Sequence, residues 1–182
     1  MKTLKPFLSL LAVLAAGTLI GCSTASTKSA DVSDSIRTSL DQAGLKDVSV
    51  SQDRDKGVVT LGGHVAGDAA KAQAAALAQS IAAGQVVANQ IAVIAPGAES
   101  DAKAVNSDLD KAIEHNLNAA LIKDKLHDSV KYSVKNHVVT LTGEVDSQSA
   151  RARAEKVAAA VLNVQQVVNE LQVKGQKATS NK

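Results

Sequence analysis

Two kinds of hydrophobic spacing alternate along this chain. Val130, Tyr132 and Val134 are separated by single polar residues, which is the period of a half-buried strand. Ile113 and Leu117 belong to a stretch in which apolar residues recur every four positions, which is the period of an amphipathic helix. The chain is therefore expected to combine short strands with helices that each bury one face.

The same order of elements, helix, strand, strand, helix, strand, is predicted twice. In the first copy the predicted elements are a helix over 32–40 closed by Ala43-Gly44, a strand at 48–50, a turn at Lys56-Gly57, a strand from Val58, a helix from Gly67-Asp68 and a strand over 87–93. In the second copy they are a helix over 108–122 with a capping box at Ser107 and Asp110, a strand at 130–134, a turn at Asn136-His137, a strand from Val138, a helix from Asp146-Ser147 and a strand over 167–173.

A sequence repeat supports this reading. The eight residues 58–65 (VVTLGGHV) return as 138–145 (VVTLTGEV) with six of the eight identical, and 87–93 returns as 167–173 at the same offset of 80. Two copies at so long a period indicate tandem domains and not a solenoid.

The pattern predicts an α+β fold in which each copy is a two-layer α-β-β-α-β domain. The helix between the second and third strands permits those two strands to run parallel. Alanine is frequent on its predicted buried face and would let the helix lie close to the sheet. The residues of that face are Ala70, Ala74, Leu77 and Ile81 in the first copy and Ala150, Ala154, Val157 and Val161 in the second.

The N-terminus has the features of an export signal. Lys2 and Lys5 precede an apolar run over 6–20, which is shorter than the roughly 20 residues of a membrane-spanning helix. The tetrapeptide 19–22 (LIGC) resembles the lipobox of bacterial lipoproteins, which implies cleavage before Cys22 and acylation of that cysteine. Several acyl chains would hold the mature protein on a membrane. The alternative is an ordinary secretory signal in which the cysteine is incidental.

These observations divide the chain into six parts. They are a cleaved lipoprotein signal peptide (1–21), a lipidated cysteine with a flexible tether (22–30), the first domain (31–95), a linker that begins with Pro96-Gly97 (96–106), the second domain (107–174) and a polar tail (175–182).

Charge and cysteine content argue against some classes of function. Removing Lys2 and Lys5 with the signal leaves 18 basic residues against 18 acidic ones, so the mature chain is neutral and lacks the basic excess of a nucleic-acid-binding protein. Cys22 is the single cysteine, and its acylation leaves neither a disulfide nor a thiolate metal site.

The sequence offers little for catalysis. Its four histidines have no metal-ligand spacing and are expected to be solvated; they are His64, His115, His127 and His137. Asn89 and Asn169 recur at one strand position, where an amide is expected to satisfy backbone groups. Gly63 and Gly143 are expected to allow a bend or a close approach. There is no nucleophile elbow or phosphate loop, so we expect no enzyme and no cofactor.

One surface cluster is a candidate for binding. The second copy carries basic residues at the end of its first helix and along its second helix, where the first copy retains only Lys71, aligned with Arg151. Each basic residue near an anionic membrane adds about 1 kcal/mol of attraction. The alternative is a solvated helix face neutralised by Asp124 and Glu155. The cluster consists of Lys123, Lys125, Arg151, Arg153 and Lys156.

The repeated motif and the closing segment 164–173 (VQQVVNELQV) resemble the BON domain, and two copies behind a lipobox are similar to dual-BON outer-membrane lipoproteins. The resemblance implies attachment to phospholipid membranes and a role in envelope integrity or stress tolerance. It implies an outer-membrane anchor facing the periplasm, with the membrane itself as partner. The alternative is a protein–protein scaffold in an envelope or secretion complex, with lipid contact only through Cys22.

Overall fold

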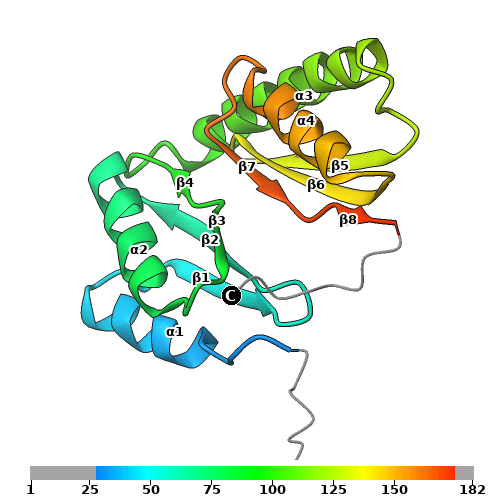
Figure 1. Ribbon diagram of the computed structural model, residues 1–182. Coiled ribbons are helices and arrows are strands. Elements are labelled where there is room, and N and C mark those ends of the chain that lie inside the picture. Colours follow the sequence, from blue (N-terminus) through cyan, green and yellow to red (C-terminus); the bar gives the residue numbers. More distant parts are fainter. Residues whose placement is uncertain (1–27, 175–182) are drawn as a thin grey trace, which may run out of the picture.

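The computed structural model describes residues 28–174, which form two domains of one topology joined by a long helix (Figure 1). The predicted signal peptide, Cys22, most of the tether and the tail (175–182) lie outside the described residues. The helices lie on the outer sides of the molecule and the two sheets lie toward each other (Figure 1).

The first domain follows the predicted order with one additional short strand. Its elements are α1 (Ser33–Gln42), β1 (Val48–Asp53), β2 (Val58–Val65), α2 (Asp68–Ile81), β3 (Val86–Asn89) and β4 (Ala92–Val93). The second domain repeats it with α3 (Glu99–Lys123), β5 (Val130–Lys135), β6 (Val138–Val145), α4 (Gln148–Ala159), β7 (Gln166–Asn169) and β8 (Gln172–Val173).

Each sheet is mixed. β1 pairs antiparallel with β2 across a tight turn, while β3 and β4 pair parallel with β2 after the crossover through α2. The second sheet has the same pairings among β5, β6, β7 and β8. The predicted α+β class and the predicted parallel pair are confirmed.

The closing strand of each copy is interrupted where a single strand was predicted. In the first copy the Asn89 side chain accepts from the Ile91 backbone N–H (3.4 Å) and donates to the Lys71 carbonyl oxygen (3.3 Å). The Asn169 side chain does the same with Leu171 (3.2 Å) and Arg151 (3.3 Å). The prediction that these amides satisfy backbone groups is therefore confirmed, and each amide ties the break in the strand to the neighbouring helix.

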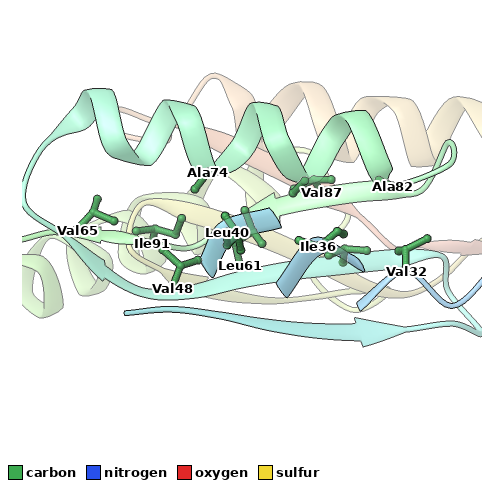
Figure 2. Packing of buried hydrophobic residues seen from close by; sticks show 12 residues of the cluster. Val32, Ile36, Leu40, Val48, Leu61, Val65, Ala74, Ala82, Val87 and Ile91 are labelled. Atoms are coloured by element: carbon green, nitrogen blue, oxygen red, sulfur yellow. The ribbon is translucent and has the colours of Figure 1, made fainter. Parts of the chain in front are cut away.

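The core of each domain lies between its helices and its sheet. Figure 2 shows Ile36 and Leu40 of α1 beside Leu61 of β2, all fully buried. On α2 the deepest residues are Ala74 and Ala78. Leu77 and Ile81, which were predicted for the buried face, are only partly buried. Removing this apolar area from water, at about 25 cal/mol per Å², is the main stabilising term of these aromatic-poor domains.

Two glycines are required at matching places in the sheets. Gly63 has φ +84 and Gly143 has φ +116, a region that costs other residues free energy. A Cβ atom on Gly63 would also lie 2.0 Å from the Asp47 carbonyl oxygen, and one on Gly143 would lie 2.5 Å from the Ser129 carbonyl oxygen. The prediction that these glycines allow a bend and a close approach is confirmed.

The predicted linker is mostly helical. α3 begins at Glu99, soon after Gly97 turns the chain with φ +84, and continues to Lys123 without interruption. Ser107 therefore lies inside the helix, and the predicted capping box is wrong. Ala102, Lys103 and Ala104 are strong helix formers, which explains the extension. Within the described residues no helix, α3 included, combines the length and apolarity needed to cross a membrane.

The first domain begins before residue 31, so the predicted tether is too long at this end. The Ser29 backbone N–H donates to the Arg54 carbonyl oxygen (2.9 Å), and the Arg54 Nε donates back to the Ser29 carbonyl oxygen (2.8 Å). Lys28 also pairs with Asp55 (3.3 Å). Composition suggested a free segment, but its backbone groups find partners at the turn between β1 and β2.

The two domains touch through the sheet faces that carry no helix. Val58 and Ala88 of the first sheet join Val138 and Val168 of the second in one buried cluster. These residues alternate with the core-facing residues of the same strands, so each sheet is apolar on both faces at this point. Because the cluster excludes water from both sheets, it couples the two copies.

Polar contacts around this cluster follow an approximate twofold relation. The Lys56 Nζ contacts the Glu170 Oε2 (2.7 Å), and the Asn136 Nδ2 donates to the Gln90 carbonyl oxygen (2.7 Å). Lys56 and Asn136 occupy one position in the repeat, as do Gln90 and Glu170. The bond to Glu170 raises the pKa of Lys56.

Gln166 departs from this symmetry. Its side-chain amide accepts from the Asn89 backbone N–H (2.9 Å) and donates to the Val87 carbonyl oxygen (2.7 Å). The N–H groups of Val86 and Gln90 donate toward the β2 side of β3. Because backbone groups alternate in direction along a strand, the Asn89 N–H and the Val87 carbonyl oxygen point away from β2. One side chain of the second domain therefore bonds the free edge of β3.

Candidate functional site

The predicted basic cluster lies on the helical layer of the second domain. α3 ends and α4 begins on the same side of that domain (Figure 1). Lys123 is the last residue of α3, Lys125 lies in the turn that follows, and Arg153 and Lys156 lie on α4; all four side chains are exposed. The structure therefore presents these four charges to solvent.

Arg151 has a different role from its predicted one. Its side chain is partly buried, and a terminal guanidinium nitrogen donates to the Asn169 carbonyl oxygen (3.1 Å). That carbonyl lies at the break between β7 and β8. Arg151 thus fastens α4 to the closing strand, and it is removed from the exposed cluster.

Neighbouring acidic groups reduce the remaining charge only in part. Glu155 on α4 is exposed and accepts from the Asn169 Nδ2 (2.9 Å), which holds this carboxylate near the strand end. Asp124 separates Lys123 from Lys125. Exposed charges of this kind are screened by salt, so their attraction to a charged surface is strongest at low ionic strength.

An exposed apolar side chain stands beside the two lysines. Ile122 is 55% exposed, although it belongs to a helix whose other face is well packed. Ile122 was predicted only as the last residue of a helix. Its spacing from Leu117 and Leu121 would have shown that it lies off the buried face. We call Ile122, Lys123, Lys125, Arg153 and Lys156 the α3/α4 surface.

The conformation of Lys125 is costly. It has φ +58, whereas the first copy has Gly44, with φ +77, at the same place. The two positions are equivalent because both helices end with the same hydrogen bond. The Leu45 N–H donates to the Leu40 carbonyl oxygen, and the Leu126 N–H donates to the Leu121 carbonyl oxygen. A non-glycine residue in this region costs about 1 kcal/mol.

The equivalent end of α1 is neither basic nor apolar. Asp41 and Gln42 occupy the places of Ile122 and Lys123, and Gly44 occupies that of Lys125. The two domains thus share a core and differ on this surface.

Three of the four histidines are exposed, as predicted; His137 is not. His64, His115 and His127 lie at the surface, whereas His137 is half-buried and its Nε2 is enclosed. No cluster of three His, Cys, Asp or Glu side chains suited to a metal ion occurs in residues 28–174.

Comparisons with known proteins agree with this fold. A model of the BON domain matches residues 28–95 and 109–175. Osmotically-inducible protein Y of Escherichia coli strain K12 is 32% identical over 137 residues, which cover 74% of this chain and 67% of the relative.

Two solved structures of CdsD, a structural protein of the type III secretion system of Chlamydia trachomatis, also match. One has a TM-score of 0.36 and 12% identity, and the match covers 76% of this chain and 90% of that one. The other, of the C-terminal domain, has a TM-score of 0.32 and 14% identity over 78% of this chain and 65% of its own length. The two matched ranges of the BON model span both domains described above, and the chain therefore belongs to the BON-domain family.

Proposed function

We propose that this chain is a non-enzymatic protein of the cell envelope, held on the outer membrane by acylated Cys22 and facing the periplasm. In this proposal the α3/α4 surface of the second domain binds anionic phospholipid and helps the envelope withstand osmotic stress. The family and the similarity to an osmotically inducible protein support the setting. The carrying observation is the exposed Ile122 flanked by Lys123 and Lys125.

The chemistry of that surface suits the boundary of a bilayer. An exposed isoleucine gains free energy by entering the acyl region, while lysine stems lie along apolar surface and keep their charges among the headgroups. The positive φ of Lys125 supports a functional reason for a basic side chain there, because glycine would be less strained.

Lipid anchoring supplies the local concentration that a weak surface needs. Four exposed basic side chains contribute about 4 kcal/mol at low salt, which alone gives only weak binding. A tether converts this into an intramolecular contact. The domain then orients on the membrane without requiring a tight site.

The main test is co-sedimentation of residues 23–182 with anionic and with zwitterionic vesicles at low and physiological salt. The variant Lys123→Gln/Lys125→Gly/Arg153→Gln is expected to bind anionic vesicles about 100-fold more weakly. Lys125→Gly restores the residue type of the first copy, so the fold is kept. The control Lys103→Gln removes an exposed charge near the other end of α3 and should bind normally.

Ile122→Ser separates the apolar contribution from the charges. It is expected to weaken binding at both salt concentrations, because burial of apolar area is not screened. If residues 23–182 bind neither type of vesicle at either salt concentration, the α3/α4 surface does not recognise lipid, and a protein-binding scaffold becomes the better hypothesis.

The anchor has its own test. When cells that express the full chain are grown with a labelled fatty acid, the protein should become labelled. The substitution Cys22→Ser should abolish this labelling, and the Cys22→Ser protein should be absent from membrane fractions. Labelling that persists in Cys22→Ser would refute acylation at this residue.

A further inference from the structure

An apolar side chain is exposed on the second domain where the first domain buries one. Leu162 is 76% exposed, more than any other large apolar side chain within residues 28–174. Its counterpart at the offset of 80 is Ala82, which is 1% exposed in the core of the first domain. Single apolar side chains are common on protein surfaces, so exposure alone is not informative. The difference between the two copies is informative, because their cores are otherwise alike.

The course of the chain after α4 explains this difference. α2 continues to Ile81, whereas α4 ends at Ala159, which is two residues earlier in the repeat. The place that Ala82 fills is enclosed and sized for alanine, and forcing a leucine into such a place destabilises a core. The chain instead leaves the helix in a tighter turn, in which the Val161 N–H donates to the Ala158 carbonyl oxygen (3.1 Å).

The loop that carries Leu162 is held in place on both sides. Val161 before it and Val164 after it both pack against the core of the second domain. The Val164 N–H donates to the Val161 carbonyl oxygen (3.3 Å), which closes the turn between them. Asn163 has φ +69, a conformation that asparagine adopts more readily than most residues. Leu162 therefore needs little additional ordering to make a contact outside the chain.

This loop lies on the helical side of the second domain. α3 and α4 run in opposite directions, so their last residues lie at opposite ends of the helical layer (Figure 1). Ile122 lies at the end of α3, and Leu162 follows the end of α4. The loop between α4 and β7, in orange, stands on the same outer side of the domain as the two helices (Figure 1). The helical layer therefore has an exposed apolar side chain at each end.

The surface between these two side chains is basic. Arg153 and Lys156 are exposed on α4. On α3, four exposed residues at spacings of four, four and three positions share one face. They are Lys111, His115, Ala119 and Ile122. None of these four is acidic, although Asp108, one turn earlier, pairs with the Lys111 Nζ (3.2 Å). The layer thus combines apolar and basic side chains, as helices at the surface of a bilayer do.

We propose that Leu162 enters the bilayer together with Ile122, so that the helical layer of the second domain lies flat on an anionic membrane. The basic side chains between them then contact the headgroups. The contact of Leu162 rests on the proposed lipid binding by the α3/α4 surface and extends it to the other end of the layer. The first domain does not bind in this way, because Asp41 and buried Ala82 occupy the two matching places.

The chain contains no tryptophan, so one introduced tryptophan reports on a single place. Leu162→Trp and Ile122→Trp are made separately in residues 23–182, which include all of the described fold. With anionic vesicles the emission of each tryptophan should shift to the blue, and lipids brominated along their acyl chains should quench it, because both side chains leave water. The control Gln79→Trp, at an exposed place near the end of α2 in the first domain, should show neither change.

Leu162→Ala measures how much this side chain adds to binding. Alanine is the residue of the first copy, and an exposed leucine supports no core, so the melting temperature should stay unchanged. Affinity for anionic vesicles should fall about tenfold, a loss of about 1.4 kcal/mol, at both low and physiological salt, because burial of apolar area is not screened. The control Val86→Ala shortens an exposed apolar side chain of the first domain and should bind as the original chain does.

The two tryptophans separate a failure at Leu162 from a failure of lipid binding itself. Blue shifts and quenching in both variants, with weaker binding of Leu162→Ala, would support flat contact of the helical layer. If Ile122→Trp responds and Leu162→Trp does not, or if Leu162→Ala binds undiminished, the proposal for Leu162 is overturned while the α3/α4 surface still binds lipid. If neither tryptophan responds, both proposals are overturned.

Discussion

Replacing Gln166 by methionine tests how the two domains are joined. Methionine keeps the length and most of the volume of glutamine but cannot form the two bonds to Asn89 (2.9 Å) and Val87 (2.7 Å). The apolar cluster under the side chain remains. The substitution therefore removes hydrogen bonding at the domain contact with little change in packing.

The expected magnitude follows from the number and environment of these bonds. Each contributes about 1 kcal/mol net, and the partly buried groups on β3 regain water only when the domains separate locally. Their sum is about 2 kcal/mol, which corresponds to roughly a 30-fold change in an opening equilibrium.

Native-state hydrogen exchange at the Asn89 amide measures this opening directly, because its N–H donates to the Gln166 side chain. Exchange should accelerate roughly 30-fold in Gln166→Met. The same change at exposed Gln172 should have no effect. An Asn89 amide that exchanges at its original rate in Gln166→Met would show that the apolar cluster alone joins the domains.

Three further outcomes follow from the structure. Gly143→Ala should destabilise the chain by about 2 kcal/mol or more in urea unfolding, because φ is positive and the new Cβ meets the Ser129 carbonyl oxygen; a smaller loss would mean that β6 shifts freely. Tyr132, the single tyrosine, should ionise above its ordinary pKa of about 10 because of burial and then Glu114, so stability falls as pH rises through that range; absorbance at 295 nm would show an ordinary pKa if this is wrong. Glu170→Gln should cost less than about 1 kcal/mol at neutral pH because Lys56 is 45% exposed. The pKa of Lys56 is raised, so its contribution is present below about 10.4 and lost above the folded-state value, and a cost that persists there would contradict the ion pair.

Hydrophobic spacing was sufficient to predict most elements of each domain. Val58 and Val138 begin strands in both copies as predicted, and Gly44 follows the first helix. These features depend on residues close in sequence, so periodicity and turn chemistry reveal them. The repeat then confirmed the order, because two independent stretches gave the same pattern.

The break in each closing strand was not predictable from spacing alone. The residues around Asn169 alternate as a continuous strand does, and the amide was expected only to satisfy nearby backbone. Its bond to the α4 backbone turns the chain out of the ladder. The same break frees the carbonyl that Arg151 binds, so the basic cluster was overestimated by one residue.

Contacts between the domains were missed for a related reason. Gln166 begins a strand, and a polar residue there is ordinarily read as solvent-exposed. Its partners lie nearly 80 residues away in the other copy, so no local pattern reports them. His137 was expected to be solvated because the spacing of the histidines does not suit a metal site, whereas its turn lies against the first domain.

The contact between the domains also determines which strand edges stay open to other molecules. An unpaired edge invites edge-to-edge aggregation, and charged side chains discourage it. Exposed Lys131 and Lys135 protect the edge of β5, whereas β3 has only the uncharged sequence Val86–Asn89. A first domain expressed alone would expose that edge without protection, so the second copy acts as an intramolecular guard against self-association.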